Sequence, residues 1–215
     1  MSIYYNIGST LAKVCFTLFS RYNVNGKDAV PKIGPLIVVS NHISNADIPL
    51  IVISIPRKLS FLGKKDLFRG PIASSILHGI GVYPIERSGA DMRATRWALR
   101  ALAEDKALLL FPEATRSHTA SMNKAGPGIA YLALKSQAPI LPIAVTGTEN
   151  VPFMWRIPFP LCKMTVRIGD PFNLPFIKRA PSKDVLEDMS DMIMRRVADL
   201  LPERYQGHYK MPAST

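Results

Sequence analysis

The sequence predicts an α/β fold, with a single domain whose central, mostly parallel sheet is flanked by helices. Short apolar runs rich in Val, Ile and Leu alternate along the chain with helix-like segments. Such alternation is typical of a sheet with helices on its faces, where sites form at the carboxyl ends of the strands. The length of 215 residues suits one domain that buries its own core.

An apolar helix is predicted at the start of the chain, over residues 3–20. Lys13 interrupts this run, which is shorter than the ~20 apolar residues that cross a bilayer, so a transmembrane span is disfavoured. A signal peptide is also disfavoured, because the run lacks a preceding positive segment and a following small-residue cleavage site. Two interpretations remain: a helix that lies in the membrane interface, or a helix packed on the core. We treat residues 1–22 as this N-terminal segment and residues 23–215 as the main domain.

The apolar runs predict strands at residues 36–39, 59–62, 82–85, 108–111, 140–145 and 164–168. Helices are predicted at residues 48–55, 71–78, 91–104, 128–136 and 182–201. Pro142 interrupts the fifth strand, which predicts either an edge strand or a local distortion. Residues 205–215 are predicted to form a mobile tail.

The charge balance points to an anionic partner, because the formal net charge is +11 at pH 7. Nucleic acid, an anionic membrane surface and a phosphorylated substrate all fit this charge. The two cysteines, Cys15 and Cys162, lie far apart and show no paired spacing. A disulfide framework or a zinc site is therefore disfavoured, and a reducing, cytosolic compartment fits best.

A histidine and a carboxylate follow the first predicted strand, as His42 and Asp47. The turn between them can fold Asp47 back toward the imidazole. An imidazole held by a carboxylate is suited to take a proton from a hydroxyl that attacks a carbonyl. The alternative is that Asp47 stabilises the start of the helix at 48–55 beside an incidental His42, and the spacing alone favours this alternative.

Charged residues also follow two other predicted strands: Arg87 after 82–85, and Glu113 with Arg116 after 108–111. A guanidinium stays charged and offers a planar set of donors to phosphate oxygens. Glu113 could accept hydrogen bonds from substrate hydroxyls or hold Arg116. The alternatives are a solvated Arg87 and a surface ion pair between Glu113 and Arg116.

Four segments, in this order and spacing, resemble the glycerophospholipid acyltransferase family, which includes bacterial 1-acylglycerol-3-phosphate acyltransferases. The family's blocks Asn-His-x4-Asp, Gly-x-x-Phe-Ile-x-Arg, Phe-Pro-Glu-Gly-Thr-Arg-Ser and Val-Pro-Val are similar to residues 41–47, 81–87, 111–117 and 141–143. The resemblance spans residues 30–145. Pro84 replaces an aromatic residue of the second block, and Ala114 replaces the glycine of the third. If that glycine adopts a backbone conformation that other residues disfavour, Ala114 would adopt it at a cost in free energy.

The resemblance implies that residues 23–215 are an acyltransferase domain. The reaction would move a fatty acyl group from an acyl thioester, acyl-CoA or acyl-ACP, to the sn-2 hydroxyl of 1-acylglycerol-3-phosphate, giving phosphatidic acid. His42 would be the general base and Asp47 its orienting carboxylate. The residues implied in binding the glycerol phosphate are Lys64, Arg87, Glu113 and Arg116. The resemblance implies neither a cofactor nor a metal.

A different lyso-lipid acceptor is the close alternative, and a non-catalytic protein that binds anionic membranes or nucleic acid is the alternative from another class. For an acyltransferase, the expected partners are the membrane surface, the lysophospholipid and the acyl thioester, including acyl carrier protein as one donor, with no nucleic acid. Peripheral or monotopic association with the cytoplasmic face of the cell membrane is then expected. The basic helix at 91–104 and the aromatic segment 153–159 are the surfaces expected to meet lipid.

Overall fold

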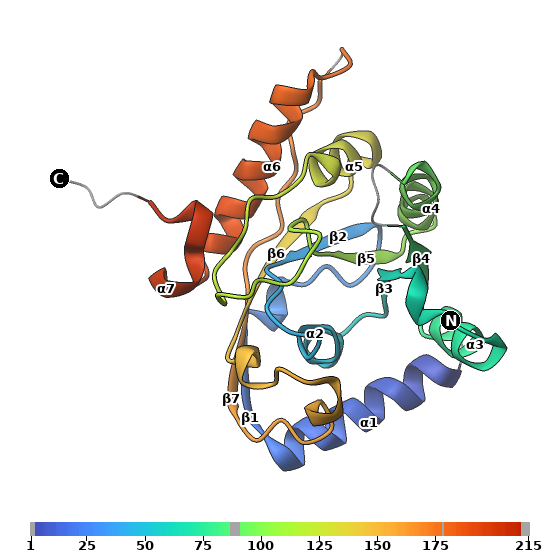
Figure 1. The fold of residues 1–215 in the computed structure, drawn as a ribbon. Coiled ribbons are helices and arrows are strands. Elements are labelled where there is room, and N and C mark those ends of the chain that lie inside the picture. Colours follow the sequence, from blue (N-terminus) through green and yellow to red (C-terminus); the bar gives the residue numbers. More distant parts are fainter. Residues whose placement is uncertain (1–2, 87–90, 178, 212–215) are drawn as a thin grey trace.

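The protein has a seven-stranded sheet in the order β1-β7-β6-β2-β5-β3-β4, shown in Figure 1. This computed structural model describes residues 3–86, 91–177 and 179–211. Five neighbouring strands, from β6 to β4, run parallel, whereas β7 is antiparallel to β6 and parallel to β1. The α/β fold with a mostly parallel sheet is therefore confirmed. The strands are β1 Arg21–Asn25, β2 Leu36–Ser40, β3 Leu59–Lys64, β4 Val82–Ile85, β5 Ala107–Leu110, β6 Ile140–Thr146 and β7 Lys163–Ile168.

Helices cover both faces of the sheet and form three layers with it (Figure 1). On one face lie α1 Ile3–Phe19, α2 Asp47–Ser54 and α3 Pro71–Gly79. On the other lie α4 Met92–Ala103, α5 Gly128–Ser136 and α6 Lys183–Ala198, followed by the short α7 Glu203–Gln206. All five helices predicted after the N-terminal one are present.

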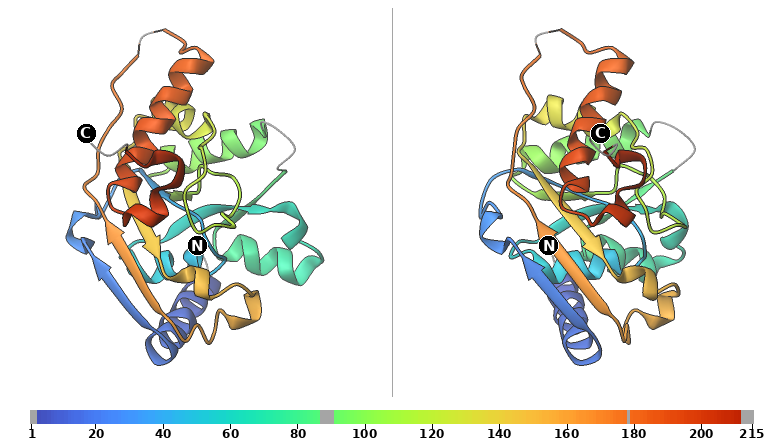
Figure 2. Two further views of the ribbon diagram at one scale, coloured as in Figure 1. Left: turned by 60° about the vertical axis from the view of Figure 1, so that its left-hand side comes forward. Right: turned by 90° about the vertical axis from the view of Figure 1, so that its left-hand side faces the viewer.

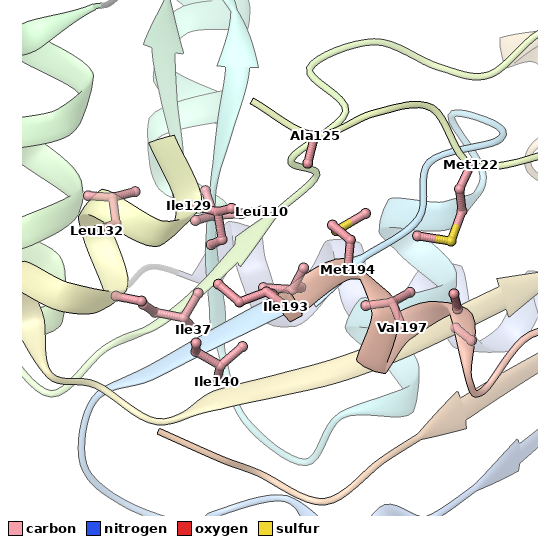
Figure 3. Packing of buried hydrophobic residues seen from close by; sticks show 14 of the residues in the cluster. Ile37, Leu110, Met122, Ala125, Ile129, Leu132, Ile140, Ile193, Met194 and Val197 are labelled. Atoms are coloured by element: carbon pink, nitrogen blue, oxygen red, sulfur yellow. The ribbon is translucent and has the colours of Figure 1, made fainter. Parts of the chain in front are cut away.

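A separate hydrophobic core lies on each side of the sheet. Figure 3 shows the first, in which Ile37 and Ile140 from the sheet meet Ile129 of α5 and Ile193 of α6. The second contains Leu50 of α2 together with Phe16 of α1. Because β2 has apolar cores on both sides, all five of its residues are buried, as in parallel sheets covered on both faces.

The edge strand β1 was not predicted, because its sequence Arg-Tyr-Asn-Val-Asn contains no apolar run. Its residues alternate between exposed and half-buried, and it pairs in parallel with β7 at the rim of the sheet. The boundary predicted at residue 22 falls inside this strand.

Pro142 lies in a central strand, so the interpretation of β6 as an edge strand is wrong. The local distortion that the proline also predicted is present. The regular pairing of β6 with β7 stops at Ile143 and Ile168, and the next pairing is an isolated bridge between Ile140 and Phe172. Pro142 accepts a hydrogen bond from Gly169 N within this irregular stretch. The missing N–H of Pro142 therefore falls where the ladder is already interrupted.

The N-terminal helix α1 has one buried edge and a wide exposed apolar surface. Tyr5 and Phe16 are buried, and Tyr5 Oη accepts a hydrogen bond from Leu59 N at 2.9 Å. Six large apolar side chains of the same helix are exposed: Ile3, Tyr4, Ile7, Leu11, Val14 and Leu18. Among the described residues, no helix has both the length and the hydrophobicity needed to cross a bilayer.

The prediction of a mobile tail from residue 205 is wrong for the part that the structure describes, residues 205–211. Tyr205 and Tyr209 are buried, with 2% and 6% of their surface exposed. Both views of Figure 2 place α7 beside the loop of residues 112–126. After α6 the chain therefore packs against this loop.

Candidate active site

The loop after β2 carries the candidate base and is tied to the neighbouring strand β6. Asn41 follows the last residue of β2, and its side-chain Nδ2 donates to Val145 O at 2.9 Å. Val145 N donates back to Asn41 Oδ1 at 2.8 Å. This reciprocal pair extends the contact between β2 and β6 past the end of β2, so the start of the loop is fixed relative to the sheet.

His42 and Asp47 are in contact. The distance from His42 Nδ1 to Asp47 Oδ2 is 2.8 Å, and Asp47 is fully buried. With the proton on Nδ1, the other ring nitrogen, Nε2, keeps its lone pair and can accept a proton. The ring of Phe111 stacks on the imidazole with 4.0 Å between centroids. The imidazole is therefore held by a carboxylate at one nitrogen and by an aromatic face.

Asp47 also organises the backbone of the loop. Its Oδ2 accepts hydrogen bonds from Ile43 N at 2.7 Å and Ser44 N at 2.9 Å. The carboxylate thus accepts hydrogen bonds from the loop amides and from the imidazole together, at the first residue of α2. The N-cap residue of α2 is Ala46, which makes no side-chain cap. Ser44 instead donates through Oγ to Val151 O at 2.7 Å and links this loop to the segment after β6.

Thr148 completes the surroundings of Asp47 and was missed by the sequence reasoning. Its hydroxyl donates to Asp47 Oδ1 at 2.5 Å, and the residue is fully buried. It begins a short 3-10 turn, Thr148–Asn150, two residues after β6 ends at Thr146. A polar residue just past the carboxyl end of a buried parallel strand is the signal that could have found it.

Glu113 joins two loops of the site. Its Oε1 accepts from His42 N at 3.0 Å, and its Oε2 accepts from Asn123 N at 2.8 Å. Ser117 N donates to His42 O at 2.8 Å and strengthens the same junction. Burial raises the pKa of Glu113, while hydrogen bonds from the Asn123 and His42 amides act in the opposite direction. Since Glu113 is buried and binds backbone amides, the surface ion pair with Arg116 is wrong.

The three cations predicted to hold phosphate have different surroundings. Arg116 is exposed, and no described residue forms an ion pair with it. Lys64 is the last residue of β3 and pairs with the carboxylate of Asp66. Arg87 lies outside the described residues; Glu86, which precedes it, follows β4 and pairs through Oε1 with Lys65 Nζ at 2.5 Å. Their role in substrate binding stays a prediction.

The site lies where the chain reverses its direction of travel across the sheet. From β2 the chain moves outward to β3 and β4, returns to β5, and then crosses to β6 on the other side of β2. The contacting pair His42 and Asp47, here called the dyad, follows β2. Glu113 follows β5 and Thr148 follows β6, so all emerge at the carboxyl ends of adjacent parallel strands. Such reversal points are where open α/β sheets bind their ligands.

Comparison with known proteins places this site in a family. The family model described as Acyltransferase matches residues 21–146, which include the dyad and Glu113. The chain belongs to this acyltransferase family. It is therefore a transferase, and the alternative of a non-catalytic binding protein is set aside.

This acyltransferase is similar over most of its length to two curated relatives and to one solved structure of another protein. It is 24% identical over 197 residues to the 1-acyl-sn-glycerol-3-phosphate acyltransferase of Bacillus subtilis, covering 91% of this chain and 96% of that protein. It is 31% identical over 175 residues to the enzyme of that name from Cocos nucifera, covering 78% of this chain and 54% of that protein. The crystal structure of the 1-acyl-sn-glycerophosphate (LPA) acyltransferase PlsC from Thermotoga maritima superposes with a TM-score of 0.71 at 27% identity, covering 91% of this chain and 79% of that chain.

Proposed function

We propose that this acyltransferase moves a fatty acyl group from acyl-CoA or acyl-ACP to the sn-2 hydroxyl of 1-acylglycerol-3-phosphate, producing phosphatidic acid. The observation that carries the proposal is the imidazole of His42, which a fully buried Asp47 holds at Nδ1 and which keeps Nε2 for a substrate hydroxyl. The names of the relatives supply the acceptor. No cofactor or metal is part of the proposed reaction.

The proposed reaction is a direct transfer between the two substrates. His42 Nε2 takes the proton as the hydroxyl oxygen attacks the thioester carbonyl, and Asp47 stabilises the imidazolium that forms. The tetrahedral intermediate then collapses, the carbon–sulfur bond breaks, and the leaving thiolate receives the proton from His42. No side chain of the enzyme becomes acylated. Lys64, Arg87 and Arg116 are proposed to bind the phosphate, because charged donors suit phosphate oxygens.

The role of Glu113 in this proposal is narrower than the resemblance implied. Each of its oxygens already accepts a backbone N–H, one from His42 and one from Asn123. We therefore propose that Glu113 acts mainly by holding these two loops together, with Arg116 presented to the substrate from the same 112–126 loop.

We further propose that the enzyme works on a membrane surface, as a peripheral or monotopic protein of the cytoplasmic face. The exposed apolar residues of α1 adjoin those of α3 and of the segment 153–161. Helix α1 contacts α3, and the ring centroids of Phe19 and Phe159 are 4.8 Å apart. We call this surface the apolar face. It comprises the six exposed residues of α1, Ile72 and Ile76 of α3, and Phe153, Met154, Trp155, Phe159 and Leu161.

The apolar face is connected to the dyad. The aromatic residues of this face lie in a segment that begins after Val151. The carbonyl of Val151 accepts a hydrogen bond from Ser44 Oγ in the loop between β2 and α2, here called the catalytic loop. Both proposed substrates carry long acyl chains that partition into a bilayer. An interfacial position would therefore bring lipid to the site without transfer of the chains through water.

A panel of lyso-acceptors, each offered with acyl-CoA and with acyl-ACP, tests the proposed reaction when product lipids are read by mass spectrometry. We expect phosphatidic acid from 1-acylglycerol-3-phosphate, and loss of thioester consumption in His42→Ala. His78→Ala, which changes an exposed histidine on α3, is the matched control and should keep the activity. Preferred acylation of another lyso-lipid would overturn the proposed acceptor, and an active His42→Ala would overturn the proposed base.

A further inference from the structure

We infer that Thr148 is a positioning residue for the reaction, acting through Asp47. Its hydroxyl donates to Asp47 Oδ1 and so directs Oδ2 toward His42 Nδ1. The inference rests on the proposed roles of His42 and Asp47. It adds to them a third side chain that comes from the turn after β6, more than a hundred residues along the chain.

The two oxygens of Asp47 accept hydrogen bonds from different donors, which supports this role. Oδ2 accepts from the imidazole and from two backbone amides, while Oδ1 accepts from Thr148. The torsion that rotates a carboxylate is broad, and rotation would exchange the two oxygens. A donor fixed at Oδ1 opposes that rotation. Because Asp47 is fully buried, water cannot readily replace the lost donor.

The turn that presents Thr148 is itself closely fixed. Gly147 has a φ of +89°, and a Cβ added there would lie 2.1 Å from Lys163 O on β7, so this position requires glycine. Val151 N donates to Thr148 O at 2.9 Å, and Val151 O accepts from Ser44 Oγ. The segment 147–151 therefore contacts the catalytic loop at both Ser44 and Asp47. The hydroxyl is held against Asp47 by backbone contacts on either side of it.

The charged groups close to the dyad in the described residues are few. Glu113 contacts the backbone amide of His42 from the loop after β5, and Asp47 contacts its ring from the start of α2. Thr148 carries no charge, so replacing it with valine removes one hydroxyl and leaves the charge of the site unchanged. Any effect on the reaction is then an effect of the lost hydrogen bond on Asp47 and, through it, on His42.

Three variants test the inference: Thr148→Val, Thr148→Ser as the conservative replacement, and Thr146→Val as the matched control. Thr146 is the half-buried last residue of β6, two positions before Thr148, and its described partner in the sheet is Thr165, paired through the backbone. We expect kcat of Thr148→Val to fall about 10- to 100-fold, the usual worth of a hydrogen bond to a buried charge, with the KM of both substrates changed by less than about twofold. Thr148→Ser should retain most of the activity and Thr146→Val all of it.

The pH profile separates positioning from simple damage to the fold. In Thr148→Val the carboxylate has lost the donor that fixes its orientation, so the hydrogen bond that His42 Nδ1 donates to Asp47 Oδ2 is altered. The acidic limb of kcat/KM should therefore move in Thr148→Val and stay in place in Thr148→Ser. The downfield proton resonance of His42 Nδ1–H, assigned by its loss in His42→Ala, should shift or broaden only in Thr148→Val.

Two results would overturn the inference: an unchanged kcat in Thr148→Val, or an equal loss in Thr148→Val and Thr148→Ser with no movement of the pH limb. Failure of the proposed function is distinguishable from both, because it would appear as no transfer by the unaltered chain. Even if the unaltered chain shows no transfer, the His42 Nδ1–H resonance still tests whether Thr148 orients Asp47. An identical resonance in Thr148→Val would then contradict it.

Discussion

At the scale of single residues, Ala114 occupies a backbone conformation that usually belongs to glycine. Its φ is +58°, in the left-handed region, directly after Glu113 and two residues before Arg116. The family pattern has glycine at this position, so the departure noted in the sequence has a cost in the structure. An L-residue in this region is destabilised by roughly 1–2 kcal/mol.

Replacing Ala114 with glycine should raise the free energy of unfolding by up to about 1 kcal/mol, because relief of the strained φ exceeds the added entropy of the unfolded chain. Urea denaturation measures the change. Ala120→Gly is the control, since Ala120 also has a positive φ, of +59°, but its methyl packs against the core. The gain there should be smaller. A less stable Ala114→Gly variant would show that the alanine methyl makes contacts worth more than the strain.

Glu113 and Arg116 should separate in their effects, although both belong to one sequence motif. Glu113→Ala leaves the buried amides of His42 and Asn123 without their acceptor, so the free energy of unfolding should fall by about 2 kcal/mol or more. Arg116→Ala removes an exposed side chain, so stability should change by less than about 0.5 kcal/mol while the KM of the phosphate-bearing acceptor rises. Denaturation and steady-state kinetics on both variants check this. An unchanged acceptor KM in Arg116→Ala would remove Arg116 from the phosphate site.

The five-residue spacing of His42 and Asp47 allowed their contact, but the resemblance of the four segments, and not this spacing alone, favoured it. Local spacing could not predict the contact of Thr148 with Asp47 or that of Glu113 with the His42 amide, because those contacts depend on which strands become neighbours. β2 and β6 pair across the sheet although about a hundred residues separate them. Arg87 was predicted from the same logic and lies outside the described residues.

At the scale of elements, the segment from α7 to Tyr209 holds the 112–126 loop. Met122 N donates to Tyr205 O, and His208 N donates to Met122 O. Tyr209 Oη accepts from Ala125 N at 2.8 Å and donates to Asp191 Oδ1 on α6 at 3.0 Å. The loop that carries Glu113 and Arg116 is thus supported by residues near the other end of the chain.

Tyr209→Phe should weaken this support, because the ring remains but Ala125 N loses its acceptor. We expect the free energy of unfolding to fall by about 1–2 kcal/mol. Hydrogen exchange of the amides of residues 117–126 should become faster in the variant. Tyr83→Phe is a control, because that ring stacks on Trp97 on β4 and α4, away from the 112–126 loop. Equal exchange rates in Tyr209→Phe and the unaltered chain would contradict the proposed support.

Tyr209 also predicts a loss of stability in alkali. Burial, followed by the hydrogen bond to Asp191 and the charge of Asp191, raises the pKa of Tyr209. Above pH ~10 the unfolded chain releases this proton and the folded chain keeps it, so the free energy of unfolding should fall by up to about 1.4 kcal/mol per pH unit from this group. Urea denaturation across this range should show a shallower decline in Tyr209→Phe. Identical pH slopes for the two chains would contradict the prediction.

Elements with continuous apolar runs were predictable, and those without were not. The runs that became β2, β5 and β6 are almost entirely buried, since burial on both faces demands apolar residues, and those that became β3, β4 and β7 are partly buried. β1 carries alternating polar residues because one rim of the sheet is solvated. The sequence of residues 205–211 resembles a polar tail, yet Tyr205 and Tyr209 are buried against the 112–126 loop. This contact joins segments far apart in the sequence, so only the folded structure shows it.

At the scale of the whole molecule, the surfaces that the sequence grouped together as lipid-binding lie apart. The apolar face belongs to α1, α3 and residues 153–161, whereas the basic helix α4 lies on the opposite face of the sheet (Figure 1). Arg93, Arg96 and Arg100 of α4 are exposed there. The net charge of +11 is therefore not concentrated on the apolar face alone.

Binding to vesicles should depend on the apolar face. A Leu11→Asp and Trp155→Asp double variant should bind vesicles of phosphatidylcholine and phosphatidylglycerol more weakly than the unaltered chain, because both side chains lose their insertion into the headgroup region. Ile33→Asp is the control: Ile33 is 86% exposed and lies before β2, at the sheet edge opposite the dyad. Sedimentation with vesicles measures the bound fraction. If the double variant and Ile33→Asp lost binding equally, the loss would be due to the added negative charge and not to the apolar face.

Salt should distinguish the two surfaces further. Attraction between basic helices and an anionic leaflet is screened within about 10 Å at 0.1 M salt, whereas burial of apolar side chains is not weakened by screening. We expect a substantial part of vesicle binding to persist at high ionic strength. Complete release of the unaltered chain by salt would assign binding to charge alone.

The support that Tyr205 and Tyr209 give to the 112–126 loop has a consequence for the order in which the enzyme becomes complete during synthesis. A ribosome delivers the dyad and all seven strands well before it adds residue 209. Until then Ala125 and Met122 lack the partners that fix their loop. A nascent chain could therefore have its sheet and its histidine in place while the loop remained unsecured. Acyl transfer at its full rate would begin only when residues 203–209 had been made and had folded back onto the loop.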